Sequence, residues 1–193
     1  MPQTNLQPHL YGMRGTLSAQ LAAERLDRAA RAIASPVTTR RGLAARLNYL
    51  TRHRGGHQAL RDAGVTVTPR TLRNWQRGTT SPSPANRQRI DDAYLRLRRK
   101  NLAPTLARRL NNDGRGTRVE LYPHDQTAVD APRRRGNVTG HRTVNCRHWE
   151  HIAAAWADQD PTALKDAWQD AVLEEVGSDW GAYEYSTAVG FPL

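Results

Sequence analysis

The segment from Thr68 to Gly78 constrains the fold more than any other, because its residues predict a short helix with two chemically opposite faces. Leu72 and Trp75 fall on an apolar side. The opposite side carries polar residues at spacings i, i+3, i+4 and i+7, which bring them to one helical face: Arg70, Arg73, Asn74 and Arg77. Taken alone, such a face is as typical of a solvated helix surface as of a binding surface.

The ends of this helix are also marked in the sequence. Thr68 can accept a hydrogen bond from the first free amides as N-cap, and Pro69 suits the first helical position. Gly78 can adopt the left-handed conformation that ends a helix. A helix over 69–77 is therefore expected.

A second short helix is predicted just before it, over 57–63, ending at Gly64. The pair forms a candidate helix-turn-helix, although the link 64–68 is about two residues longer than the usual turn. In this motif the second helix enters the major groove, where Arg can bond guanine and Asn can bond adenine. We expect Arg73, Asn74 and Arg77 to read bases.

Further helices are predicted around this pair, from Thr16 to Ala34, from about Arg41 onward and from about Ala85 to Lys100. Pro104 breaks the last run, and a further helical turn is expected over 106–111. These elements predict an N-terminal all-α domain over 16–112, preceded by a disordered segment over 1–15. The long helix 85–100 is rich in arginine, and phosphate contacts are expected from four of its side chains: Arg87, Arg98, Arg99 and Lys100.

A turn-rich junction at 111–116 predicts the domain boundary. Beyond it the pattern favours a small C-terminal α+β domain over 113–193, with a mobile loop over 123–140. The strands are expected at 117–122, 142–147 and 182–189, and the helices at 149–157 and 163–176.

Charge is distributed unevenly along the chain. The formal net charge of +11 is the sum of +16 in residues 1–112, +3 in 113–147 and −8 in 148–193. Surplus positive charge around a helix-turn-helix is typical of phosphate binding, so DNA is the expected partner. The alternative is a composition bias, since arginine-rich usage also follows from a GC-rich genome.

The cysteine content and hydropathy predict the compartment. Cys146 is the only cysteine, so no internal disulfide can form and a reducing compartment fits. No apolar stretch is long enough to span a membrane, and the first residues lack the core of a signal peptide. We expect a soluble cytoplasmic protein without a membrane partner.

Metal and catalytic motifs are weak. His141, Cys146, His148 and His151 lack the paired spacing of a structural zinc site, so ordinary core or surface residues are the favoured interpretation. Glu174, Glu175 and Asp179 are interpreted as a solvated acidic face rather than a divalent-metal site. Nucleotide-hydrolysis, zinc-protease and acyl-transfer motifs do not occur. We therefore predict no metal site, no cofactor of its own and no enzyme active site.

Several segments, taken in order, resemble the Tpg-type telomere terminal proteins of linear actinomycete chromosomes and plasmids. The segments are R-L-N-Y-L-T at 46–51, A-L-R-D-A-G-V at 59–65, P-R-T-L-R-N-W-Q-R-G at 69–78, S-P-S-P-A-N-R-Q-R-I at 81–90, R-T-V at 142–144 and W-Q-D-A-V-L-E-E-V at 168–176. They span most of the chain.

The resemblance implies a protein that binds telomeric DNA and offers a threonine hydroxyl as covalent primer for end replication. It implies two partners, a DNA polymerase that supplies the divalent metal and a telomere-associated protein, and a location at DNA ends in the nucleoid. By position relative to the R-T-V segment, Thr139 is the first choice for the priming residue and Thr127 the second.

Two other functions remain open. One is a helix-turn-helix transcriptional regulator whose C-terminal domain dimerises or binds a partner, which would make a homodimer on a palindromic site. The other is a regulatory protein of a mobile element whose acidic region contacts another protein.

Overall fold

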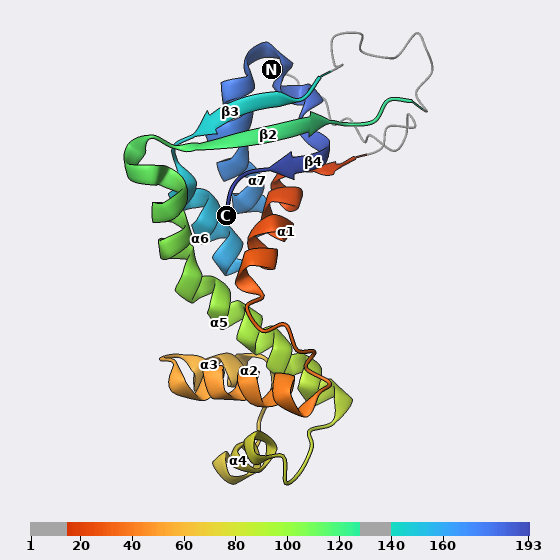
Figure 1. Ribbon diagram of the computed structural model, residues 1–193, viewed down its shortest axis with the longest axis vertical. Helices are drawn as coiled ribbons and strands as arrows, with labels where there is room; N and C mark the ends of the chain where they lie inside the picture. The colour runs from red at the N-terminus through yellow and green to blue at the C-terminus, as the bar shows by residue number, and fades with distance from the viewer. Residues whose placement is uncertain (1–14, 128–139) are drawn as a thin grey trace. The chain divides into compact units, whose positions relative to one another are not determined.

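The computed structural model describes residues 15–127 and 140–193 (Figure 1). Within these residues the chain forms seven α-helices and one small antiparallel sheet. The predicted combination of a helical part with an α+β part that holds a small sheet is confirmed, although the α+β part is the larger of the two. The expectation of a disordered segment over 1–15 falls almost wholly outside the described residues, as does most of the predicted loop 123–140.

The described chain divides into two compact units. One is the helical unit, Asp27–Leu102, and the other, the sheet unit, takes the described residues on both sides of it. The sequence placed a single boundary at 111–116, whereas the sheet unit combines residues from both ends of the chain. The long-range pairing that produces this division leaves no compositional mark in the sequence.

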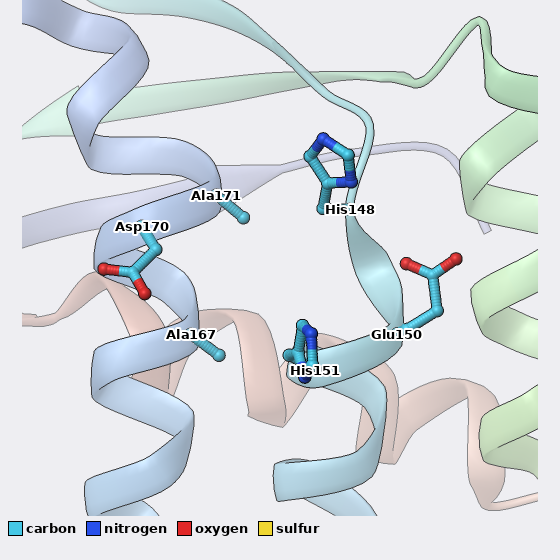
Figure 2. A pocket seen from close by; sticks show the side chains of 6 residues that line it. All are labelled: His148, Glu150, His151, Ala167, Asp170 and Ala171. Atoms are coloured by element: carbon cyan, nitrogen blue, oxygen red, sulfur yellow. The ribbon is translucent and has the colours of Figure 1, made fainter.

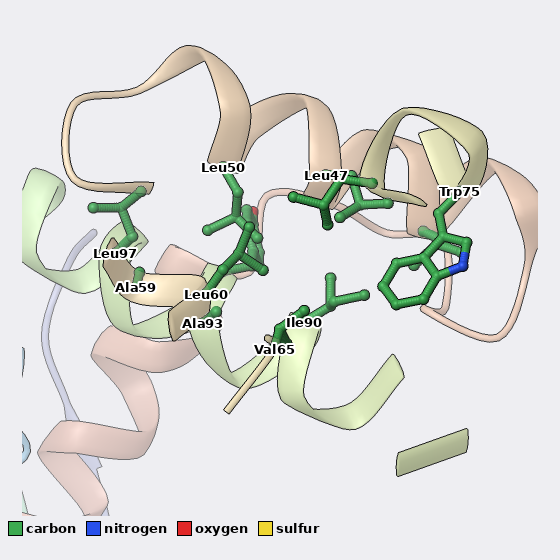
Figure 3. Packing of buried hydrophobic residues seen from close by; sticks show 12 residues of the cluster. Leu47, Leu50, Ala59, Leu60, Val65, Trp75, Ile90, Ala93 and Leu97 are labelled. Atoms are coloured by element: carbon green, nitrogen blue, oxygen red, sulfur yellow. The ribbon is translucent and has the colours of Figure 1, made fainter. Parts of the chain in front are cut away.

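The helical unit contains α2 (Arg40–Arg52), α3 (Gly56–Asp62), α4 (Pro69–Arg77) and the first part of α5 (Pro84–Asn111). Its core is a cluster of buried aliphatic and aromatic side chains, part of which Figure 3 shows. Each buried leucine contributes about 1.5–3 kcal/mol relative to exposure. The cluster draws on all four helices: Leu43, Leu47, Leu50, Ala59, Leu60, Val65, Leu72, Trp75, Ile90, Ala93, Tyr94 and Leu97.

The start of α3 packs directly against the backbone of α2. A Cβ atom at Gly56 would lie 1.6 Å from the carbonyl oxygen of Leu50, so only glycine permits this backbone contact. Polar contacts of the buried Arg46 of α2 also stabilise the packing. Its guanidinium pairs with Asp91 of α5 and donates to the carbonyl oxygens of Ser35 and Gly42. The helices of this unit are thus fixed by both apolar and ionic contacts.

The sheet unit is built on four strands in the order β1-β4-β2-β3, all antiparallel. Its elements are β1 (Thr16–Leu17), most of α1 (Ser18–Ala30), β2 (Thr117–Pro123), β3 (Arg142–Cys146), α6 (Trp149–Asp158), α7 (Pro161–Trp168), a π-helical turn η4 (Gln169–Leu173), 3₁₀ turns η5 (Glu174–Ala182) and β4 (Tyr185–Gly190).

Buried aromatic rings fill the space between this sheet and its helices. Trp149 packs against Trp168 and Phe191, with ring centroids 6.2 and 4.9 Å away. The indole nitrogen of Trp149 donates to the carbonyl oxygen of Cys146, and that of Trp168 donates to the Ser18 hydroxyl. Both buried donors are therefore satisfied.

Three secondary-structure predictions need correction. Thr16 and Leu17 form a strand instead of opening a helix, and that helix ends at Ala30. Helix α5 continues through Pro104 to Asn111, because Ala103, Leu106, Ala107 and Leu110 bury one face beyond the proline. The single helix predicted over 163–176 changes to a π turn after Trp168.

Candidate nucleic-acid interface

Helix α4 has the two-faced character that its sequence predicts. Leu72 and Trp75 are buried in the core of the helical unit. On the other face Arg70, Arg73 and Arg77 are exposed and Asn74 is half-buried. The helix therefore presents three guanidinium groups to solvent while its apolar side anchors it.

Both ends of α4 are fixed as expected. The Thr68 hydroxyl accepts from the Thr71 amide at 3.2 Å, and Pro69 occupies the first turn. Gly78 closes the helix with φ 73°. A Cβ there would lie 2.4 Å from Arg40 Nε, and Arg40 Nη2 donates to the Arg77 carbonyl oxygen at 2.8 Å. Arg40 thus holds the C-terminus of α4, a role that its sequence context did not indicate.

A polar contact joins the last turn of α4 to α2. Gln76 Nε2 donates to Asn48 Oδ1 at 3.2 Å and to Thr51 Oγ1 at 3.0 Å. Together with buried Trp75, this contact sets the rotation of α4 about its axis. The exposed arginines therefore emerge in a defined direction from the helical unit.

The link between α3 and α4 is anchored rather than loose. It runs over 63–68, and Val65 in its middle is buried in the core. The Val65 amide donates to the Leu60 carbonyl oxygen at 2.9 Å, while Gly64 takes φ 80° to make the turn. The extra residues of this link are thus accommodated by packing.

The helical unit is strongly cationic, with 17 Arg and Lys side chains against four Asp residues. Each carboxylate is engaged within the unit: Asp91 pairs with Arg46, Asp27 pairs with Arg99, and the other two accept from Gln58 and Gln88. Among the described residues no ion pair involves Arg70, Arg73 or Arg77. Their charge is available to an external anion.

The four side chains of α5 that were predicted to contact phosphate have different environments in the structure. Arg99 forms a bidentate ion pair with Asp27, with N–O distances of 2.8 and 2.7 Å. Arg98 donates to the Ala30 carbonyl oxygen, and its guanidinium lies over the Tyr49 ring. Arg87 is half-buried, whereas Lys100 is exposed. We therefore centre the candidate interface on α4, because Arg98 and Arg99 already serve the fold.

The predicted priming residues lie in the sheet unit's sequence. Thr127 is exposed, and its amide donates to Asp125 Oδ1 at 2.8 Å. Thr139 lies outside the described residues.

The side chains considered above as possible metal ligands do not lie together in one site. Burial raises the pKa of the Cys146 thiol to about 11, which opposes thiolate ligation at neutral pH. His148 and His151 line an open hollow between α6 and the α7–η4 segment, where Glu150 and Asp170 lie at opposite ends (Figure 2). Asp179 pairs with Arg142 at 3.6 Å. In the described part of the chain, no group of three or more such side chains is arranged to hold a metal ion.

No family model, no curated protein and no solved structure matches this chain. The function therefore has to be argued from its own residues. Within the described ranges, no helix has the length and apolar character needed to cross a membrane.

Two exposed aromatic side chains escaped the sequence analysis. Tyr122 and Trp180 are 38% and 39% exposed and are the large hydrophobic residues that the described chain leaves at its surface. The alternation in T-R-V-E-L-Y could have revealed Tyr122, since it shares a strand face with Arg118 and Glu120. Trp180 gave no such signal, because its exposure depends on the 3₁₀ turns of η5.

Proposed function

We propose that this protein binds duplex DNA through a helix-turn-helix formed by α3 and α4, with α4 entering the major groove. The observation that carries the proposal is a firmly anchored helix whose exposed face bears Arg70, Arg73 and Arg77 without an internal ion-pair partner in the described chain. Arg can bond guanine O6 and N7 bidentately, and Asn74 on the same face suits adenine.

The fixed position of α4 favours this role. Its caps, its buried Leu72 and Trp75 and its bonds to α2 order the helix before DNA arrives. Less conformational entropy is then lost on binding, and the reading side chains keep one register. The net charge of +13 on the helical unit would add sequence-independent attraction to phosphates.

The test is a comparison of a selected DNA site with scrambled DNA. Sites are selected from random duplexes with the full chain, and affinities are measured by fluorescence anisotropy. Arg73→Ala with Asn74→Ala should weaken the selected site by about tenfold or more and scrambled DNA much less, since each bidentate contact contributes about 1–3 kcal/mol of discrimination. Arg41→Ala is the matched control, because it removes one exposed charge outside α4 and should affect both duplexes alike.

Equal losses on both duplexes for the α4 variant would contradict base reading by α4. Failure of the full chain to bind any duplex at physiological salt would overturn the proposal as a whole.

The resemblance to telomere terminal proteins extends the proposal from binding to priming. In that role the helical unit would bring a threonine hydroxyl to the end of a linear replicon. The hydroxyl oxygen would attack the α-phosphorus of a deoxynucleoside triphosphate held by a partner polymerase. This forms a phosphodiester, releases pyrophosphate and passes the hydroxyl proton to a base of the polymerase. Exposed Thr127 satisfies the requirement for access, and Thr139 remains the residue that the resemblance favours.

Priming is tested with labelled deoxynucleotide, telomeric DNA and the cognate polymerase. Label that survives denaturation, and is lost in Thr139→Ala or Thr127→Ala, would support a protein primer. Duplex binding without any covalent label would instead favour the helix-turn-helix regulator, particularly if a dimer binds a palindrome.

A further inference from the structure

One face of the sheet is left open by the described residues. In β2, Val119 and Leu121 are buried against the helices, while Arg118 and Tyr122 point the other way and are exposed. The strand register adds Asn145 opposite Arg118 and Ala188 opposite Tyr122 to this open face, and both are exposed. Figure 1 shows the helical turns that follow α7 passing behind β3, on the side that is covered.

An aromatic stack lies at one end of this face. The rings of Tyr122 and His141 are nearly parallel, with centroids 5.4 Å apart and an interplanar angle of 23°. Tyr122 is nevertheless 38% exposed. The pair is therefore held in a stacked arrangement at the surface instead of being buried in the core.

The segment that carries Trp180, the second exposed aromatic residue, contacts the start of β3. Arg142 Nη2 lies 3.6 Å from the carboxylate of Asp179, the neighbour of Trp180. The Tyr183 hydroxyl donates to the Gly140 carbonyl oxygen at 2.9 Å. The register pairs Arg142 with buried Leu121, so Arg142, which contacts Asp179, belongs to the covered side of the sheet, whereas His141 stacks on Tyr122 on the open side.

A cation shares the open face with these rings. The side chain of Arg118 is 65% exposed, and its contact with Glu120 is a surface ion pair of 3.2 Å. An exposed pair of this kind contributes little to stability, so the guanidinium can exchange its carboxylate for a phosphate at small cost. Exposed rings on the same face as an exchangeable guanidinium group suit unpaired nucleotides, whose bases stack while their phosphates are neutralised.

We propose that the surface made on the open face by Tyr122, His141 and Arg118, here called the aromatic platform, binds single-stranded nucleic acid. A paired duplex keeps its base faces inside the helix, so the ligand must offer unstacked bases. The platform is separate from α4 and does not depend on the proposed duplex binding. The chain then carries two nucleic-acid sites of different preference.

The test uses the full chain and a fluorescent oligothymidylate of about 12 nucleotides, within the usual span of such sites, followed by anisotropy. Tyr122→Ala should weaken binding about tenfold, because stacking of one base on an aromatic side chain contributes on that order. Tyr122→Phe keeps the ring and should bind within about twofold of the wild type. Near-ultraviolet circular dichroism checks that each variant keeps its fold.

A second pair of variants separates the two sites. Arg73→Ala with Arg77→Ala should reduce duplex affinity and leave oligothymidylate affinity unchanged, whereas Tyr122→Ala should do the reverse. Glu120→Gln removes a carboxylate from the platform face and should tighten oligothymidylate binding.

The proposal is overturned if the wild type does not bind oligothymidylate at physiological salt, as expected if the rings contact a protein instead. It is also overturned if a folded Tyr122→Ala variant binds like the wild type. Loss of duplex binding alone would refute the proposed function and leave the platform intact.

Discussion

Arginine side chains in the helical unit serve two different purposes. Arg46 and Arg99 neutralise half-buried carboxylates and so stabilise the packing of helices. Arg70, Arg73 and Arg77 meet solvent. Periodicity alone assigns all of them to polar faces, which is why Arg99 was predicted to contact phosphate. The pattern does not show which arginine will meet an aspartate from another helix.

This division predicts unequal effects on stability. Arg99→Ala leaves the half-buried Asp27 without its bidentate partner, and we expect the free energy of unfolding to fall by about 2 kcal/mol. Arg96→Ala on the same helix should cost less than about 0.5 kcal/mol, as is usual for substitutions away from such pairs. Urea unfolding followed by circular dichroism measures both, and similar losses for the two variants would contradict the assigned role of Arg99.

Elements whose ends are encoded locally were predicted well. Thr68, Pro69 and Gly78 define α4 by short-range chemistry, and the structure has each of them in the expected position. Thr16 and Leu17 were misassigned because their pairing with Tyr185 and Ser186 is a property of the folded sheet. The π turn after Trp168 is likewise a product of packing, since no breaker marks it in the sequence.

Pro104 is the clearest conflict between local preference and tertiary structure. A proline inside a helix removes one backbone hydrogen bond and costs about 3 kcal/mol, yet α5 continues because the residues beyond it are buried. Since Pro104 itself is exposed, replacing it loses no packing.

Pro104→Ala should therefore raise the free energy of unfolding, by about 1–3 kcal/mol. Thr105→Ala, at the neighbouring exposed position, is the control and should change it by a few tenths of a kcal/mol. Thermal unfolding followed at 222 nm compares them. A lower melting temperature for Pro104→Ala would show that α5 needs the proline for a bend.

At the scale of the whole molecule, charge is divided between a cationic helical unit and an anionic stretch over 148–193. This uneven charge is read directly from the sequence. The two units are not, because the sheet draws its strands from both ends of the chain. The candidate site was predictable as far as α4, whereas the aromatic platform required the sheet register.

The cationic unit predicts a steep salt dependence of duplex binding. If about six phosphates are neutralised, affinity should fall roughly a thousandfold between 50 and 200 mM salt through lost counterion release. Arg70→Ala should reduce the slope of log affinity against log salt by about one if Arg70 contacts a phosphate. Anisotropy titrations at four salt concentrations give both slopes, and a flat profile would argue against electrostatic engagement.

The pairing of Thr16 with Ser186 has a consequence for biosynthesis. The core of the helical unit is assembled from residues between Leu43 and Leu97, so it can collapse while later residues are still being translated. The sheet cannot close until residue 186 has left the ribosome, and closing so long a loop is slow. Until then β2 and β3 lack the strand that separates them from β1, and their open edge is a target for chaperones or for misassembly with another nascent chain.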